Sequence, residues 1–214
     1  MSPQSAPGRA ARLWLRQRLA IARRGEELLE RKREALLVEQ ARTREEHQQA
    51  RRAWVAAAAR AELWGRRALV LDGARRLDVL ACDVPGEAAL ELAWSNLMGA
   101  RLPAVAQLAI PGPLELSARG GSAAAVMSAR AAGEATRAAV RCAIAERADI
   151  EIARELAAAT RRLRALQKRW IPEHEAQLQR LELALDEAQR EQSTRVRWLM
   201  GGRREPAAHR PTGP

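Results

Sequence analysis

The stretch that decides the fold is Asn96–Pro103, which reads NLMGARLP and lies between two long segments rich in Ala, Leu, Arg and Glu. Gly99 can supply a positive φ and Pro103 favours an extended backbone, so the octapeptide alone predicts only a turn. Its weight comes from its position, because the segments on both sides have the periodicity of long helices. These two segments are called the N-terminal and C-terminal arms below.

The N-terminal arm is predicted to be one helix over residues 9–67. This range contains no proline, and only Gly25 and Gly65 interrupt a strongly helix-forming composition. Its apolar residues recur about every 3.5 positions, which is the spacing of a coiled-coil seam. The seam residues are Leu15, Leu19, Ala22, Leu29 and Leu36. At 1.5 Å per residue such a helix is on the order of 80 Å long.

The C-terminal arm is predicted to be a second long helix over residues 122–200. Its distal half has the clearest three-and-four periodicity, carried by Leu178, Leu181, Leu185, Ala188, Gln192, Arg195 and Leu199. Upstream, a seven-residue spacing runs through Leu156, Leu163 and Trp170. The phase of the seam changes near Pro172. Because proline removes one helical hydrogen bond, we expect a bend at this point and a helix that continues beyond it.

Residues 68–121 differ in composition from the two arms and are predicted to form a small globular foot. Turn sequences divide them into short elements: Asp72-Gly73, Pro85-Gly86, Pro111-Gly112-Pro113 and Gly120-Gly121. We expect short helices at Arg75–Asp83 and Glu87–Asn96. Arg101–Ile110 fits an arm of a β-hairpin or an extended segment, and periodicity does not decide between them. Residues 1–8 are expected to be a flexible lead-in, and 201–214 a disordered tail.

Composition places the chain in the class dominated by α-helices, with an antiparallel two-helix coiled coil built from the two arms. The 214 residues include no Tyr and no Phe, and the formal net charge is +11. This mixture is typical of long helices and not of a compact β-containing core. Two distant cysteines, Cys82 and Cys142, define neither a disulfide framework nor a metal site, which favours a reducing cytoplasmic compartment.

No residue pattern indicates catalysis or cofactor binding. His47, His174 and His209 are dispersed, and no phosphate-binding loop of the GxxxxGK type occurs. Asp186 and Glu187 are adjacent, so they point in different directions from a helix. We therefore expect no catalytic, cofactor or metal site. No stretch approaches the roughly 20 apolar residues that cross a bilayer, so any membrane association is expected to occur through partners.

Clusters of arginine suggest an alternative function, in which the chain is a basic coiled-coil protein that binds nucleic acid. The clusters are Arg23-Arg24, Arg31-Lys32-Arg33, Arg51-Arg52 and Arg161-Arg162. Acidic residues are interleaved with them, and no aromatic platform or nucleic-acid module accompanies them. The same arginines would suit an acidic protein surface, where charge guides association without a permanent tight grip. We therefore expect no nucleic-acid partner.

Three stretches together resemble the D subunit of the V/A-type rotary ATPases. The opening helix carries Gly25, Leu28, Leu29, Lys32, Arg33 and Leu36, and the middle signature carries Asn96, Met98, Gly99 and Pro103. The closing helix carries Thr160, Arg161, Arg162, Ala165, Leu166, Ile171, Pro172, Leu185, Asp186, Glu187, Arg190 and Glu191. The chain departs from the pattern at Arg164 and Lys168, where Asn and Glu are expected. It also lacks the aromatic residues usual near the Ile-Pro pair.

The resemblance implies a non-catalytic rotor subunit of the central stalk. Its partners would be the A and B subunits of the ATPase, the F subunit and a connector subunit of the membrane ring. Its location would be cytoplasmic and peripheral to the membrane. It would couple ATP hydrolysis or synthesis to ion transport; the sequence does not distinguish the direction, or proton from sodium. The arms are expected to pair antiparallel, with Leu19 near Arg195 and Leu36 near Leu178.

Overall fold

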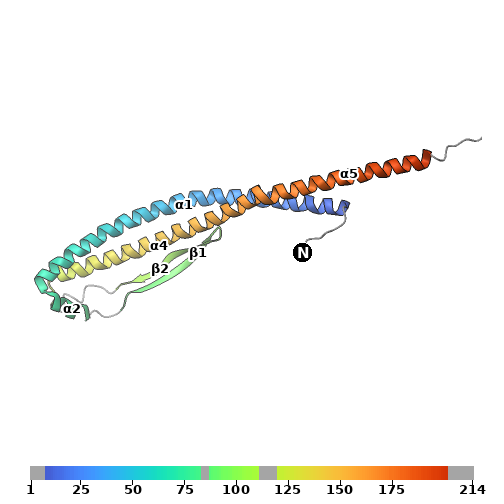
Figure 1. The fold of residues 1–214 in the computed structure, drawn as a ribbon. Helices are drawn as coiled ribbons and strands as arrows, with labels where there is room; N and C mark the ends of the chain where they lie inside the picture. The colour runs from blue at the N-terminus through green and yellow to red at the C-terminus, as the bar shows by residue number, and fades with distance from the viewer. Residues whose placement is uncertain (1–7, 83–86, 111–119, 202–214) are drawn as a thin grey trace, which may run out of the picture. The chain divides into compact units, whose positions relative to one another are not determined.

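The computed structural model describes residues 8–82, 87–110 and 120–201, and it is dominated by helices, as predicted. The element order is α1 (Arg9–Asp72), α2 (Ala74–Cys82), β1 (Ala89–Leu97), β2 (Ala100–Ala109), α4 (Ala123–Ala165), the π-helical turn η1 (Leu166–Trp170) and α5 (Ile171–Gly201) (Figure 1). The expectations for residues 1–7 and 202–214 lie outside the described residues. The chain forms two compact units, residues 1–30 with 161–214 and residues 31–160.

In the first unit the start of α1 runs antiparallel to η1 and α5. Arg16 pairs with Glu182 at 2.5 Å, and Arg23 pairs with Glu175 at 2.7 Å. Further along, the Gln167 amide donates to the Glu30 carboxylate at 2.8 Å. Between these polar contacts lies an apolar core made of Leu19, Ala22 and Ile171, with Leu166, Trp170 and Leu178 packed against it.

In the second unit the remainder of α1 runs antiparallel to α4. Arg44 lies 3.8 Å from Asp149, and Arg60 lies 3.6 Å from Glu134. One core cluster lies where α1 ends, and it contains Ala68, Leu80, Ala124 and Ala125. The other contains Leu36, Ala100, Ile152 and Ala159 and brings the β-hairpin onto the helices.

The predicted antiparallel sense is confirmed in each unit, but the predicted register is wrong. Leu19 was expected near Arg195, and yet Arg16, three residues before it, pairs with Glu182. Leu36 was expected near Leu178, and it packs instead with Ile152. The expectation took the middle of the chain as the point of reversal. The reversal is set by the helix ends, which are unequal distances from the two termini.

Polar side chains mark the point of reversal. The Ser122 hydroxyl donates to the Asp72 carboxylate, and it accepts the Ala125 N–H at 3.2 Å. Ser122 is thus the N-cap of α4, which begins at Ala123. At the other side α1 continues beyond Arg67 and ends where Gly73 adopts a φ of +74°, a conformation that glycine adopts without steric cost.

The middle of the chain contains a β-hairpin where one helix was expected. The short helix predicted at Arg75–Asp83 is confirmed by α2, and the strand reading of Arg101–Ile110 is confirmed by β2. The helix expected at Glu87–Asn96 is wrong, because the strand β1 (Ala89–Leu97) occupies most of this range. The two strands are antiparallel with a bulge after Glu91. Leu90, Leu92 and Trp94 alternate with a period of two, which suits a strand.

The hairpin lies along α4 (Figure 1). At its turn Ala100 packs with Ile152 and Ala159 of α4. Toward its open end, Ile110 lies near Gly133, since a Cβ on that glycine would be 3.9 Å from the Ile110 Cγ2. The hairpin is therefore fixed against α4 at both of its ends.

Candidate functional site: the hairpin seat on the helix pair

The tip of the hairpin is a tight turn built by Asn96, Met98 and Gly99. Met98 has a φ of +52° and Gly99 a φ of +92°, while Leu97 and Ala100 pair across the turn. A two-residue loop with positive φ at both positions is the turn whose twist matches a hairpin. The Asn96 Oδ1 accepts the Gly99 N–H at 2.9 Å, which satisfies a donor that the turn leaves free. The geometry of the turn thus accounts for Asn96 and Gly99 of the middle signature.

An ion pair between α1 and α4 lies directly beneath this turn. Lys32 Nζ donates to Glu155 Oε1 at 2.5 Å, and both side chains are about three-quarters buried. A Cβ placed on Gly99 would lie 3.5 Å from each of these two atoms. Because the pair is shielded from water, its charges attract more strongly than those of a surface pair. The turn therefore packs on an ion pair that also joins the two helices.

The apolar part of the seat surrounds the ion pair. Leu36 and Ile152 are fully buried, and Ala100 of the hairpin packs between the helices with them. Leu97, Leu102 and Leu156 pack against the same cluster. We name Lys32, Glu155 and the cluster of Leu36, Ala100, Ile152 and Ala159 the hairpin seat.

The seat brings together residues from two motif stretches that are distant in sequence. Lys32 and Leu36 come from the N-terminal stretch, and Gly99 comes from the middle signature. Pro103 is buried and stands opposite Trp94 in the hairpin register. Sequence reasoning missed Glu155, and only its charge, complementary to Lys32, could have marked it.

The outer face of the hairpin is exposed and partly apolar. Leu90, Leu92 and Trp94 each keep more than two-fifths of their surface in contact with solvent. The Arg101 guanidinium lies 4.7 Å from the centre of the Trp94 ring, in the geometry of a cation–π contact. Exposed apolar side chains beside a cation suit contact with a partner protein.

The seam residues predicted in the first unit are buried to different extents. Leu15, Leu19, Ala22 and Leu163 are buried, and Leu29, Leu178, Leu181 and Leu185 are half-buried. Ala188 and Leu199 are exposed, so their assignment to the seam is wrong. The reason is the register: Arg16 already lies opposite Glu182, and α5 extends beyond the start of α1 (Figure 1).

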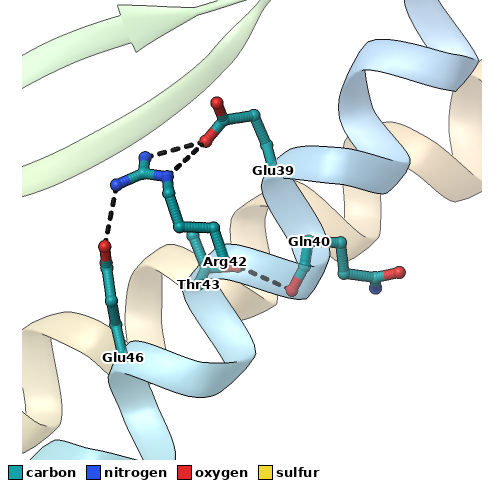
Figure 2. Close-up of polar contacts among 5 residues, drawn as sticks. All are labelled: Glu39, Gln40, Arg42, Thr43 and Glu46. Atoms are coloured by element: carbon teal, nitrogen blue, oxygen red, sulfur yellow. Dashed lines mark hydrogen bonds and ion pairs between the residues drawn. The ribbon is translucent and has the colours of Figure 1, made fainter.

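Arg42 is the centre of a polar cluster on the solvent-exposed surface of α1 (Figure 2). Its guanidinium donates to Glu39 at 2.9 Å and to Glu46 at 2.8 Å. The hydrogen bond that Arg42 donates to Glu39 and the negative charge of Glu46 raise the pKa of Arg42 above its ordinary value. The next residue, Thr43, is buried and satisfies its hydroxyl by donating to the Gln40 carbonyl at 3.2 Å. The cluster stabilises the helix surface and leaves Thr43 to face the interior.

Replacing Arg42 with Gln should change stability by less than about 0.5 kcal/mol, because its side chain is 56% exposed and water screens both pairs. A raised arginine pKa contributes stability that is complete below the unfolded pKa and is lost only as pH rises through the folded pKa. The effect should therefore be constant between about pH 5 and 9. Urea melts of both proteins at several pH values measure it. A difference that changes within this range would contradict the assignment.

Neither a metal site nor a membrane span is found in the described part of the chain. Among residues 8–82, 87–110 and 120–201, no group of His, Cys, Asp and Glu is arranged to hold a metal ion. Within the same ranges, no helix combines the length and the apolar character that crossing a membrane requires.

Comparison with known proteins matches most of the chain to one family. The family model for the D subunit of ATP synthase matches residues 12–200. The D subunit of the V-type ATP synthase of Thermus thermophilus is 30% identical over 198 residues, covering 92% of this chain and 88% of that protein. The D subunit of the A-type ATP synthase of Pyrococcus horikoshii is 30% identical over 196 residues, covering 89% and 91%. The match includes both helical arms and the hairpin with its seat, and the chain belongs to the D-subunit family of the V/A-type ATP synthases.

Proposed function

We propose that this chain is the rotor subunit of the central stalk in a V/A-type ATPase or ATP synthase. It couples ATP hydrolysis or synthesis in a catalytic hexamer to ion transport through a membrane ring. The observation that carries the proposal is the family match over residues 12–200, since it includes the arms and the hairpin. The chain acts mechanically and has no active site of its own. In this proposal the chain is a cytoplasmic subunit that is peripheral to the membrane.

The mechanism rests on asymmetry. A shaft that presents different faces to three catalytic interfaces biases each interface toward a different nucleotide state, provided that each face has a different contact free energy. The hairpin makes the two sides of the second unit different, because it covers α4 on one side (Figure 1). Salt bridges across each helix pair resist the relative sliding of the helices under load, and they join Arg16 to Glu182 and Lys32 to Glu155.

The end of α5 is the proposed contact with the A and B subunits. Val196, Trp198, Leu199 and Met200 are exposed, Trp198 by 83% of its surface. Large apolar side chains gathered at an exposed helix end indicate a surface that a partner covers. The arginines beside them, Arg195 and Arg197, suit an acidic inner surface of the hexamer.

The end of α1 and the helix α2 form the proposed contact with the connector subunit of the membrane ring. Leu69, Val70, Leu71 and Val79 are exposed there. The F subunit is proposed to bind the side of the shaft. The outer face of the hairpin, with Leu92 and Trp94 exposed, is a surface of the kind that such a partner needs.

Deleting residues 195–214 should weaken the coupling between ATP turnover and rotation, because it removes the proposed contact with the hexamer. The variant should still assemble, since the hairpin seat and the connector contact are intact. A matched control deletes only residues 202–214 and keeps Trp198, Leu199 and Met200. Reconstituted complexes are compared by ATPase rate and ATP-driven ion transport. Equal coupling in both variants would contradict the contact, and loss of assembly in both would contradict the proposed division of roles.

The nucleic-acid alternative is tested on the same purified protein. We expect weak non-specific binding that disappears by about 0.2 M salt, because such binding is electrostatic and falls steeply with salt. Submicromolar affinity for duplex or single-stranded nucleic acid at that salt, without co-purification of the other ATPase subunits, would overturn the rotor proposal.

A further inference from the structure

Two apolar stripes on the C-terminal arm are out of phase with each other. The upstream stripe in the first unit is Leu163, Leu166 and Trp170, with intervals of three and four. Continued by the same rule, it would pass through residues 173, 177, 180 and 184, and all four of these are exposed. If the α-helix continued without interruption, these four positions would face α1, and the apolar residues that follow Trp170 would point away from it.

Each residue of the downstream stripe lies one position after the corresponding position of the continued upstream stripe. The downstream stripe consists of Ile171, His174, Leu178, Leu181 and Leu185, of which Ile171 is buried and the others are half-buried. Nevertheless, both stripes reach the same core, because Leu166, Trp170, Ile171 and Leu178 all belong to the cluster with Leu19 and Ala22. The helix must therefore accommodate one additional residue between the two stripes.

The additional residue is accommodated in η1. The Ile171 N–H donates to the Leu166 carbonyl, five residues before it, as in a π-helix. We infer that this turn is a joint that corrects the rotational phase of the helix by one residue, so that a single helix can keep two different stripes against α1. Such a correction needs an insertion of one residue and no break in the helix, and α5 continues directly from Ile171.

We expect this joint to be easier to deform than the rest of the helix, because it lacks one helical hydrogen bond. Pro172 has no N–H, so one carbonyl of the turn loses its helical donor. Side chains outside the π-helical turn contact it and offset this loss. The His174 ring stacks on Trp170 with centroids 3.8 Å apart, and its Nδ1–H donates to the Trp170 carbonyl at 2.9 Å. From α1, the Arg18 guanidinium lies 5.6 Å from the centre of the same indole. The joint is thus clamped by an aromatic stack and a cation.

Single-residue deletions test the phase correction on the full chain. Deleting the exposed Lys168 removes the additional residue, converts the turn to an α-helix and leaves the downstream stripe in place. It should lower Tm by less than about 3 °C. Deleting the exposed Gln177 rotates Leu178, Leu181 and Leu185 away from α1, and should lower Tm by about 10 °C or more. Circular dichroism melts measure both. Equal losses for the two deletions would overturn the inference.

Hydrogen exchange tests the deformability in the unaltered protein. Amides of residues 167–171, 173 and 174 should exchange roughly tenfold faster than those of 178–185, because local opening requires less free energy where a helical bond is missing. The difference should disappear when Lys168 is deleted and Pro172 is replaced by Ala in the same chain. Equal protection of both segments in the unaltered protein would contradict a deformable joint. Neither experiment involves a partner subunit, so its failure is distinguishable from failure of the rotor proposal.

Discussion

Replacing Leu36 with Asp is expected to lower the free energy of unfolding by about 4 kcal/mol. Leu36 is fully buried in the hairpin seat, against Ala100, Ile152 and Ala159. The change loses the burial of a leucine and places a carboxylate in an apolar cluster, while Lys32 of the same seat is already paired with Glu155. The seat should open, and the hairpin should lose its anchor on the helices. Denaturant unfolding followed by circular dichroism gives the free energy.

The neighbouring residue supplies the control for this prediction. Leu37 is 46% exposed, so Leu37→Asp should cost less than about 1 kcal/mol although the chemical change is the same. The two variants differ only in which side of α1 they alter. Similar losses at positions 36 and 37 would mean that the helix does not face α4 and the hairpin as described.

Replacing Gly99 with Val is expected to destabilise the chain by about 3 kcal/mol, through the backbone. Gly99 has a φ of +92°, which a β-branched residue adopts only with strain. Space alone is not the cause, because a Cβ at this position would make ordinary contacts of 3.5 Å with Lys32 and Glu155. The longer Val side chain would press on this ion pair as well. Thermal and urea melts measure the loss.

Gly25 provides the opposite expectation within the same chain. It lies inside α1, and a Cβ there would meet no atom within 4 Å. Gly25→Ala should therefore stabilise the helix by about 0.5–1 kcal/mol. If Gly99→Val proved neutral while Gly25→Ala stabilised the protein, the turn geometry of the hairpin would be wrong.

The long helices could be predicted from the sequence because their signals are local and repeated. Absence of proline, helix-forming composition and a seven-residue stripe all act within each arm, and they predicted the start of α1 at Arg9. The start of the C-terminal arm near residue 122 was predicted as well, and α4 begins at Ala123. The end of α1 was predicted too early, at Arg67, because no residue that stops a helix occurs before Gly73.

The hairpin was only half predicted, since its first strand depends on its partner. Glu87–Asn96 has a composition that permits a helix, and pairing with β2 decides otherwise. The alternation of Leu90, Leu92 and Trp94 was the available signal. Register failed for a similar reason, because it depends on where the helices end. Glu155 could not be identified, because a single acid on a long helix is indistinguishable from a solvated one until its partner is known.

The phase change near Pro172 shows what pattern reading can locate and what it cannot explain. The sequence placed the change correctly, and proline accounts for a missing hydrogen bond. Proline does not account for a shift of one residue, which requires the wider turn at Leu166–Trp170. Burial of Ile171 and exposure of Glu173 identify the shift only when the packing against α1 is known.

The most direct test of the rotor proposal is single-molecule rotation of this chain. Cys82 is exposed and Cys142 is buried, so a bead or gold particle can be attached at Cys82 in the complex with the A, B and F subunits. A Cys82→Ser variant controls for attachment elsewhere. The account predicts that adding ATP turns the particle continuously in one direction while the hexamer hydrolyses ATP. Hydrolysis by an assembled complex in which the particle stays still would contradict it.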